Sequence, residues 1–449
     1  MSQLSELKSK LETILNSTET NEFLNLVKKY QEGPSLISDW NSVKGPDPLK
    51  LPRYENLPLP DQSKLEKALQ KLVVCKLNGG LGTSMGCSGP KSAIPVRDSK
   101  SFLDLIMEQI DSLNCEYNIS VPLVLMNSFR TFGETEKIIA EYSGELDISG
   151  FLQNKFPRLE MDTLSPLSEK EYGIDAWYPP GHGDLYNCIK NQGLLDKWLD
   201  QGKEILFISN SDNLGATVDP RIAAFLLDDG SSFILEVSEK TLADIKGGTL
   251  YQTNDKLGLL EAAQVPPEGM DEFCGVDKFK TFNTNSIWIN LVRLKEKLNE
   301  GSLDFPVIAN PKTIQGTKAL QLETAMGFAV GLFDDAMGLV VPRSRFLPVK
   351  KTSDLFVVQS NVFNLEKGRL LRNPARKMEA LPLVSFGKEL NDYETYRDSF
   401  DEIPDLLELE SLKLDGDFQF GENVVLKGNI ELESKEEVNK IPKGTSISM

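Results

Sequence analysis

Histidine is almost absent from this chain, because His182 is the only one among 449 residues. A single imidazole cannot build a metal site with two histidine ligands, nor an H-E-x-x-H helix, so the common histidine-rich zinc sites are excluded. Any chemistry must therefore rest on other groups. The glycine-flanked histidine in "WYPPGHGDLY", residues 177–186, needs an explanation of its own.

Cysteine is also sparse and badly placed for cross-linking. The five cysteines are far apart, odd in number and form no C-x-x-C pair: Cys75, Cys87, Cys115, Cys188 and Cys274. This spacing argues against a disulfide framework and against a zinc site, and it favours a reducing, cytoplasmic location.

Basic charge and long apolar runs are lacking as well. Lysine and arginine number 49 against 67 acidic residues, a net charge of −18, which argues against nucleic acid or an anionic membrane as a partner. A few local lysines could still hold a small anion. No run of about 18 apolar residues occurs, and the N-terminus "MSQLSELKSKLETIL" is charged and amphipathic, so neither a membrane span nor a signal peptide is predicted.

The length and the order of the elements predict three parts. Residues 1–70 form an N-terminal segment, with a helix over 1–32, a proline-rich extended strap over 33–62 and a short helix in "KLEKALQ". In residues 71–380, strands such as "KLVVCKL", "VPLVLMNS" and "KEILFIS" alternate with helical segments, which indicates an α/β domain with a mostly parallel sheet. Ligands of such sheets lie beyond the carboxyl ends of the strands, where the loops after Leu77, Met126 and Ile208 are expected.

The last part, residues 381–449, differs in its sequence pattern from the α/β domain. In "LKLDGDFQFGENVVLKGNIEL" short apolar runs are separated by glycines at steps of roughly six residues, which indicates about two rungs of a small β-helix. An irregular β-meander is the alternative.

A glycine-rich loop, "LNGGLGTSMGCSGPKS", follows the first strand directly. Its glycines let backbone N–H groups approach a ligand, and Lys91 adds one mobile cation, which together suit a phosphate. Pro90 separates Gly89 from Lys91, so the loop is not a Walker A motif, and its length and spacing do not match the dinucleotide-binding fingerprint. A purely structural turn is an equally good reading of the loop alone.

These residues carry a resemblance. The glycine-rich loop resembles the signature loop of eukaryotic-type UTP–glucose-1-phosphate uridylyltransferases, the UDP-glucose pyrophosphorylases. The similarity continues, in order, over roughly residues 30–432, in the blocks "VPLVLMNS", "AWYPPGHGDLY", "SNSDNLGATVDP", "KGGTL", "KFKTFNTNSIWIN", "LQLETAMG" and "VPRSRFLPVKKTSDL". Two departures are the second lysine in "PVKKTSDL" and a short C-terminus. The resemblance implies a Rossmann-like, GT-A-like nucleotidyltransferase domain, an N-terminal helical segment and a C-terminal left-handed β-helix.

The reaction that the resemblance implies is attack of glucose 1-phosphate on the α-phosphorus of UTP, giving UDP-glucose and pyrophosphate, with Mg²⁺ as cofactor. Such transfers depend on positioning and charge neutralisation. The attacking phosphate has a second pKa of about 6, so at pH 7 it is mostly deprotonated and needs no general base. The rival functions are a pyrophosphorylase for another sugar 1-phosphate and a non-catalytic nucleotide-sugar sensor. A monomer or a homo-oligomer formed through the C-terminal domain is expected.

The catalytic residues implied by the resemblance are Lys91, Lys350 and Asp212. Lys91 and Lys350 would neutralise phosphates, although Lys351 is an equal candidate from the sequence, and Lys91 alone could be a solvated surface lysine. Asp212 follows a strand in "ISNSDNLG" and would hold Mg²⁺ against phosphate oxygens. Without the resemblance, a turn or N-cap aspartate is the better reading.

The resemblance also implies the binding residues. UTP is expected to contact Leu77, Asn78, Gly79, Gly80, Lys91, Met126, Gln153, Gly181, Asn210, Ser211, Asp212 and Lys350. The sugar phosphate is expected to contact Gly79, Gly80, His182, Glu261, Asn283, Thr284 and Asn285, with Lys246–Gly247–Gly248 nearby. From the residues alone, packing is the better interpretation of Met126, and a polar turn before the next strand is the better interpretation of "NTN". His182 is interpreted as a donor that positions the substrate phosphate.

Overall fold

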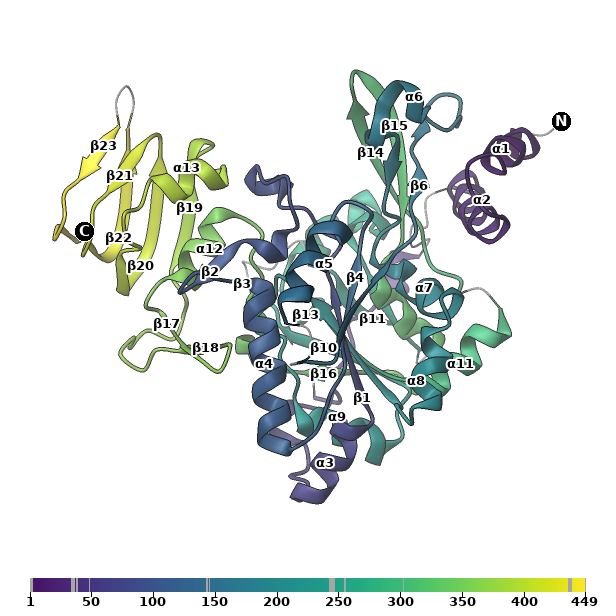
Figure 1. Cartoon of the computed structure of the whole chain (residues 1–449), viewed down its shortest axis with the longest axis horizontal. Coiled ribbons are helices and arrows are strands. Elements are labelled where there is room, and N and C mark those ends of the chain that lie inside the picture. Colours follow the sequence, from purple (N-terminus) through teal and green to yellow (C-terminus); the bar gives the residue numbers. More distant parts are fainter. Residues whose placement is uncertain are drawn as a thin grey trace.

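The structure of the chain is a computed structural model that describes residues 3–33, 37, 39–47, 49–142, 144, 146–241, 247–253, 256–301, 303–434 and 438–448. Figure 1 shows a central sheet covered by helices, with the C-terminal strands on one side of it and the N-terminal helices on the other. The C-terminal strands and the N-terminal helices therefore lie at opposite ends of the long axis of the molecule.

The central sheet has the strand order β16-β10-β13-β9-β1-β4-β5. The strand β13 runs antiparallel to both of its neighbours, whereas the other adjacent pairs are parallel. The expectation of a mostly parallel α/β sheet is therefore confirmed. The strands are β1 (Leu72–Leu77), β4 (Leu123–Asn127), β5 (Ile148–Leu152), β9 (Ile205–Asn210), β10 (Phe233–Glu239), β13 (Thr281–Asn290) and β16 (Met337–Val340).

Helices cover both faces of this sheet, because its central strands are apolar on both sides. Along β1, Leu72 and Val74 belong to one buried cluster while Val73 and Cys75 belong to another, as the alternation of side chains along a strand requires. The first face carries α3 (Gln62–Gln70), α4 (Phe102–Tyr117), α5 (Phe132–Glu141) and α9 (Pro220–Asp229). The second carries α7 (Leu185–Asn191), α8 (Leu194–Asp200) and α11 (Leu291–Glu300).

The N-terminal segment differs from the prediction in one respect. Two helices, α1 (Gln3–Leu11) and α2 (Ser17–Gln31), replace the single helix expected over residues 1–32. The side chain of Asn16 accepts a hydrogen bond from the backbone N–H of Glu19, and the Glu19 carboxylate accepts one from the backbone N–H of Asn16. This capping box starts a new helix and so divides the segment for which the apolar spacing predicted a single helix.

The helix pair packs on an arm that projects from the sheet (Figure 1). The arm is formed by β14 (Ile308–Ile314), β15 (Thr317–Glu323) and β7 (Leu159–Glu160). Leu11 and Phe23 from the helices share one buried cluster with Leu159 and Leu322 from the arm. Between α2 and α3, the described residues of the strap include two short 3₁₀ helices, Trp40–Ser42 and Tyr54–Asn56, which the expectation of an extended segment did not contain. Isolated bridges join the strap to the domain at Gln252 and Val340.

The C-terminal strands pair in parallel. The strands β19 (Leu383–Phe386), β20 (Asp405–Asp415), β22 (Val425–Glu433) and β24 (Ser446–Ser448) form one sheet, and β21 (Phe418–Phe420) pairs with β23 (Asn439–Ile441). Partners lie about one coil apart in sequence, as Leu412 with Ile430 and Phe420 with Ile441. Parallel neighbouring coils are what a β-helix requires, whereas a meander would pair antiparallel. The handedness stays a prediction, as do the domain boundaries at 70 and 380.

The C-terminal part and the α/β domain share a buried cluster. Phe386 and Phe400 pack with Phe356 of α12 (Thr352–Gln359), and the same cluster continues through α4 into the sheet. Within the described residues, no helix is both long and apolar enough to span a membrane.

Candidate active site

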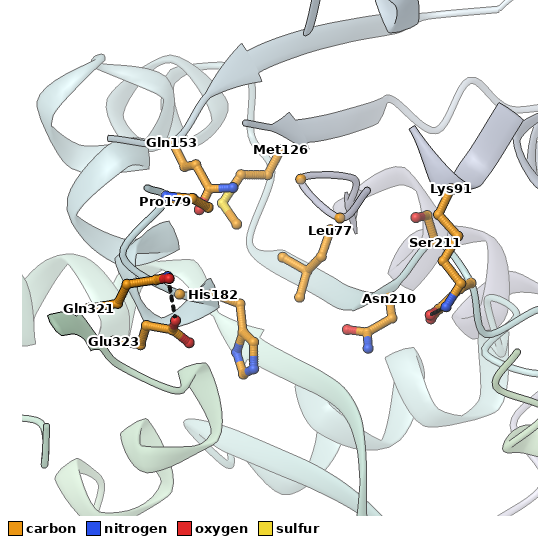
Figure 2. Close-up of a pocket in the computed structure, with 14 residues that line it drawn as sticks. Leu77, Lys91, Met126, Gln153, Pro179, His182, Asn210, Ser211, Gln321 and Glu323 are labelled. Atoms are coloured by element: carbon orange, nitrogen blue, oxygen red, sulfur yellow. Dashed lines mark hydrogen bonds and ion pairs between the residues drawn. The ribbon is translucent and has the colours of Figure 1, made fainter. Parts of the chain in front are cut away.

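A cavity of about 300 Å³ opens at the carboxyl ends of β1, β4 and β9, where the sequence predicted a site. Figure 2 shows its lining side chains, with Lys91 and Ser211 on one side and Gln321, Glu323 and His182 on the other. The residues that line it are Leu77, Gly79, Gly80, Lys91, Met126, Gln153, Pro179, Gly181, His182, Asn210, Ser211, Asp212, Gln321 and Glu323.

The glycine-rich loop forms part of this wall and closes on itself. The backbone N–H of Lys91 donates to the carbonyl of Gly80 over 3.1 Å, so both ends of the loop lie together at the cavity. A Cβ at Gly79 would collide with the amide of Gln153, whereas at Gly80 it would meet nothing within 4 Å. Gly79 is thus required for the close approach of Gln153, and Gly80 leaves its backbone open to a ligand.

The loop contains the pattern Gly82-Thr83-Ser84-Met85-Gly86, which has the spacing of a serine-nucleophile motif. Ser84 is not used in that way here. Its hydroxyl donates to the carbonyl of Lys350 over 2.9 Å, and neither Ser84 nor its neighbours Thr83 and Met85 line the cavity with His182. The hydroxyl instead joins the glycine-rich loop to the segment that carries Lys350.

Lys91 and Asp212 form an ion pair at one end of the cavity. Lys91 Nζ lies 2.6 Å from Asp212 Oδ2, and their side chains are 12% and 19% exposed. The other carboxylate oxygen, Asp212 Oδ1, is buried and has no hydrogen-bond partner. An unpaired buried carboxylate oxygen beside a lysine is costly, which marks this position as a place for a cation or another donor.

The backbone around Asp212 is fastened to the segment that precedes α12. The N–H of Val349 donates to the carbonyl of Asp212 over 3.1 Å, and Asn213 Oδ1 accepts from the N–H of Leu347 over 2.8 Å. Lys350 follows directly, so its backbone lies beside both Asp212 and the glycine-rich loop.

The side chains of Lys350 and Lys351 are exposed, and neither lines the cavity. Their backbone N–H groups both donate to Asp354 Oδ2, over 2.7 and 2.9 Å. The positive charge of Lys350 acts on Glu261, where it partly offsets the burial that raises the pKa of this carboxyl to about 7. Lys350 therefore lies on the side of the predicted sugar residues.

His182 is held in a single orientation. Its Nδ1 accepts a hydrogen bond from the backbone N–H of Met326 over 3.0 Å, and burial lowers the pKa of the ring to about 4. The imidazole is therefore neutral at pH 7, with its proton on Nε2. His182 presents a neutral donor at the cavity wall, as the positioning hypothesis requires, and it is protonated too weakly to titrate near pH 6–7.

The turn around His182 depends on two glycines. Gly181 has φ +85, and a Cβ there would lie 2.6 Å from the carbonyl oxygen of Thr324. Gly183 also packs on Thr324 and donates its N–H to that carbonyl over 2.9 Å. These contacts fasten the turn to the end of the arm strand β15.

Met126 and Gln153 line the cavity at the end away from Lys91, but Asn78 does not. Asn78 is buried, and its side-chain amide donates to Asn127 Oδ1 over 2.8 Å and to Thr135 Oγ1 over 2.9 Å. Its side chain therefore holds the ends of β1 and β4 together. Any contact of Asn78 with a ligand is left to its backbone.

Of the seven residues predicted to contact the sugar phosphate, four lie outside the lining of this cavity: Glu261, Asn283, Thr284 and Asn285. Asn285 is nevertheless linked to it, because its Nδ2 donates to Asn210 Oδ1 over 2.8 Å, and Asn283 Oδ1 accepts the N–H of Asn285. The hydroxyl of Thr284 is buried and donates to the carbonyl of Glu236, so the side chain is committed to the sheet. Glu261 packs on Gly248, whereas Lys246 lies outside the described residues.

Three cavity residues were not assigned from the sequence: Pro179, Gln321 and Glu323. The block "LQLETAMG" was recognised, but nothing in its composition shows which of its side chains face a ligand. Alternation along a strand could have suggested that Gln321 and Glu323 share a face.

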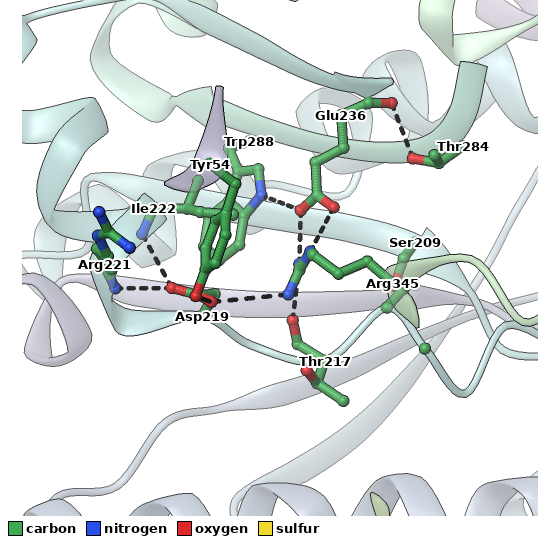
Figure 3. A network of polar contacts seen from close by, with 12 residues as sticks. Tyr54, Ser209, Thr217, Asp219, Arg221, Ile222, Glu236, Thr284, Trp288 and Arg345 are labelled. Carbon is green, nitrogen blue, oxygen red and sulfur yellow. Dashed lines mark hydrogen bonds and ion pairs between the residues drawn. The ribbon is translucent and has the colours of Figure 1, made fainter. Parts of the chain in front are cut away.

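A buried polar network lies behind the loop that carries Asp212 (Figure 3). Arg345 forms a two-point ion pair with the fully buried Glu236, over 2.7 and 2.6 Å, and donates to the carbonyl of Thr217. The Nζ of Lys76, on β1, donates to Ser209 Oγ and to the carbonyl of Ala216, each over 2.7 Å. Burial, and then the charge of Arg345, lower the pKa of Lys76 to about 7.

This network holds both ends of the loop. Ser209 and Ala216 flank Asp212 on either side, and both are bonded to the same buried ammonium. The position of the Asp212 carboxylate therefore depends on side chains that do not line the cavity.

The comparisons with known proteins agree with one another. A family model described as UTP–glucose-1-phosphate uridylyltransferase matches residues 20–427. The UTP–glucose-1-phosphate uridylyltransferase of Pyrus pyrifolia is 47% identical over 99% of this chain and 96% of its own length. That of Solanum tuberosum is 46% identical, over 99% of this chain and 95% of its own. Among solved structures, the UDP-glucose pyrophosphorylase of Leishmania major has a TM-score of 0.90 at 31% identity, covering 100% of this chain and 98% of that one.

Proposed function

The chain belongs to the family of UTP–glucose-1-phosphate uridylyltransferases, and from this premise we propose how its residues divide the work. The reaction transfers a uridylyl group from UTP to glucose 1-phosphate and gives UDP-glucose and pyrophosphate. The sugar phosphate attacks the α-phosphorus in line, and pyrophosphate leaves from the opposite side. The protein has to hold two polyanions together and neutralise charge, because the attacking oxygen is mostly deprotonated at pH 7.

The phosphates of UTP lie between the glycine-rich loop and the Asp212 loop. Lys91 approaches them from the cavity wall, 2.6 Å from the carboxylate with which it is paired. Lys350 is the second cation, and it acts at the side of Glu261. The backbone N–H groups around Gly80, where nothing crowds the chain, add neutral donors.

Asp212 would hold Mg²⁺. Its buried Oδ1 lacks a partner, and Asp212 is the carboxylate that lines the cavity beside Lys91. One carboxylate plus phosphate oxygens is a usual arrangement for this ion, so the donor set fits it. When bound, the ion supplies charge neutralisation and orientation of the phosphate oxygens.

The uracil is placed at the end of the cavity formed by Leu77, Met126, Gln153 and Gly181. His182 donates its Nε2–H to the phosphate of glucose 1-phosphate, which the neutral ring and the bond from Met326 both support. The glucose hydroxyls are proposed to meet Asn283, Asn285 and Glu261, and Thr284 through its backbone.

The finer features of the molecule are part of the same proposal. The catalytic domain is of the GT-A-like type, and the C-terminal coils form a left-handed β-helix, for which parallel pairing is the support. The protein is cytoplasmic and is a monomer or a homo-oligomer formed through these coils. Its five cysteines are free, which suits a reducing compartment.

The observation that carries the proposal is the Lys91–Asp212 pair with its unpaired carboxylate oxygen, facing a glycine-rich loop in one cavity. The test is release of pyrophosphate from UTP with a panel of sugar 1-phosphates. Glucose 1-phosphate should be used fastest, and a faster rate with N-acetylglucosamine 1-phosphate would contradict the assignment. Lys91→Ala should remove most turnover, and turnover within a few-fold of the parent would exclude the phosphate-clamp role.

Lys350→Ala and Lys351→Ala form a matched pair, since these neighbours carry the same charge and are both exposed. We expect the larger loss of kcat in the Lys350 variant. The reverse order would assign the second clamp to Lys351.

A further inference from the structure

The carboxylate of Glu323 stands at the end of the cavity opposite to Lys91 and Asp212, next to His182 (Figure 2). Its Oε1 accepts two hydrogen bonds, from Asn310 Nδ2 and from Gln321 Nε2, each over 3.2 Å. No hydrogen bond from another described residue reaches Oε2. One oxygen is thus used to fix the side chain, and the other remains available at the cavity.

The residues around Glu323 fix its direction. Arg158 Nε donates to Gln321 Oε1 over 3.3 Å, so the oxygen of this amide is occupied and its NH₂ group is turned to Glu323. Within the described residues, no lysine or arginine forms an ion pair with Glu323. Burial accordingly raises the pKa of this carboxyl, although Asn310 and more distant charges partly oppose the shift.

A half-buried carboxylate without a cation is unfavourable unless a ligand supplies donors. A phosphate is a poor direct partner for Oε2, because like charges repel at short range. A sugar offers hydroxyl donors, often two on adjacent carbons, and carboxylates are widely used to bind the hydroxyls of ribose in nucleotide sites. Both substrates of the proposed reaction carry such hydroxyls, on the ribose of UTP and on glucose.

We propose that Glu323 is a specificity-determining residue that accepts a hydrogen bond, through Oε2, from a sugar hydroxyl of a bound substrate. This inference rests on the proposed function, since it assumes UTP and glucose 1-phosphate in this cavity. It assigns to the arm strand β15 a direct part in substrate selection. The same strand end fastens the His182 turn through Thr324.

The test compares kcat/KM of the parent and of Glu323→Ala with four substrate pairs. UTP is set against 2′-deoxy-UTP and 3′-deoxy-UTP, and glucose 1-phosphate against its 2-deoxy and 3-deoxy analogues. In the parent, removal of the contacted hydroxyl should cost about 10-fold or more, the usual loss for a hydrogen bond to a charged group. In the Glu323→Ala variant, loss of the contacted hydroxyl should leave kcat/KM almost unchanged. We expect this for either the UTP analogues or the glucose 1-phosphate analogues, and the series that shows it identifies the sugar that Glu323 contacts.

Two further variants keep the result interpretable. Glu323→Gln keeps the volume and should fold even if alanine does not, with a weaker discrimination than the parent because its oxygen is neutral. Glu160→Ala changes a carboxylate on β7, in the same three-stranded sheet but away from the cavity lining, and should leave all four ratios unchanged.

The inference would be overturned if the Glu323 variants kept the parent's ratios of kcat/KM between each substrate and its deoxy analogue. This holds whether kcat/KM falls equally for all substrates, as in a general structural defect, or does not fall at all. If the parent itself released no pyrophosphate from UTP and glucose 1-phosphate, the proposed function would be wrong. Activity of the parent therefore tests the proposed function, and the ratios in the variants test the role of Glu323.

Discussion

Replacement of His182 by asparagine separates the two roles of its ring. The Oδ1 of asparagine can take the place of Nδ1 and accept the N–H of Met326, which lies 3.0 Å from Nδ1 in the parent. The donor at Nε2 is lost, because asparagine does not reach that far. The change therefore removes the contact proposed for the sugar phosphate and leaves the fastening of the turn in place.

The size of the effect follows from the kind of bond that is lost. A hydrogen bond to a charged group contributes about 1.5–3 kcal/mol, and about 1.4 kcal/mol corresponds to tenfold. We therefore expect kcat/KM for glucose 1-phosphate to fall about 10- to 150-fold. The KM for UTP should change much less, because our proposal places the triphosphate at the Lys91 end.

The assay is pyrophosphate release over pH 5.5 to 8.5 with each substrate varied in turn. The substrate phosphate itself, with a pKa of about 6, gives an acid limb that should appear in the parent and in His182→Asn alike. The ring contributes no limb there, since the pKa of His182 is lowered to about 4 by burial.

The reasoning would be refuted if the asparagine variant lost a limb between pH 6 and 7 that the parent shows. That result would mean that His182 titrates in the working range and acts as a base or as a cation. His182→Gln serves as the counterpart, because its amide can reach the Nε2 position but cannot keep the bond to Met326.

Three further predictions follow from the loops. Asp212→Asn should lower kcat by about 100-fold or more and raise the Mg²⁺ concentration for half-maximal rate; an unchanged Mg²⁺ titration would contradict the metal role. Gly181→Ala should destabilise the fold by about 1–3 kcal/mol, measured by denaturant unfolding, because φ is +85 and Cβ meets a carbonyl at 2.6 Å. Burial lowers the pKa of Lys76 from its ordinary value of 10.5 to about 7. Between these two values the unfolded chain binds more protons than the folded one, so stability rises with pH over that interval. Lys76→Met should abolish this rise between pH 7 and 9 in unfolding midpoints and lower kcat; an unchanged pH slope would place the charge elsewhere.

Much of the fold could be predicted because the central strands are short apolar runs and are clearly separated by polar and glycine-containing loops. The loops after Leu77, Met126 and Ile208 meet at one cavity because the carboxyl ends of parallel strands share one edge. The break at Asn16 was missed because a capping box is a local bonding pattern that does not interrupt the apolar spacing. Parallel pairing of the C-terminal strands was expected from the resemblance and from the glycine spacing, although the spacing also allowed a β-meander.

The site could be predicted only in part. Lys91 and Asp212 were expected together and lie 2.6 Å apart. The sequence could not show that the hydroxyl of Thr284 is used by Glu236, because this depends on where the neighbouring strand β10 lies. Glu323 was missed for a related reason. Its partner Asn310 lies on the neighbouring strand β14, and only the folded arm brings Glu323 to the cavity.

The charges of the protein explain why the site is built as it is. A chain of net charge −18 repels polyanionic substrates at long range, so attraction has to be created locally. Lys91 is paired with Asp212, which leaves this end of the cavity nearly neutral and avoids an isolated buried charge. A triphosphate can then compete for Lys91 only if a cation takes its place beside Asp212. Binding of the nucleotide and of Mg²⁺ should therefore be coupled through this one ion pair, with Lys76 behind it fixing the loop that sets its geometry.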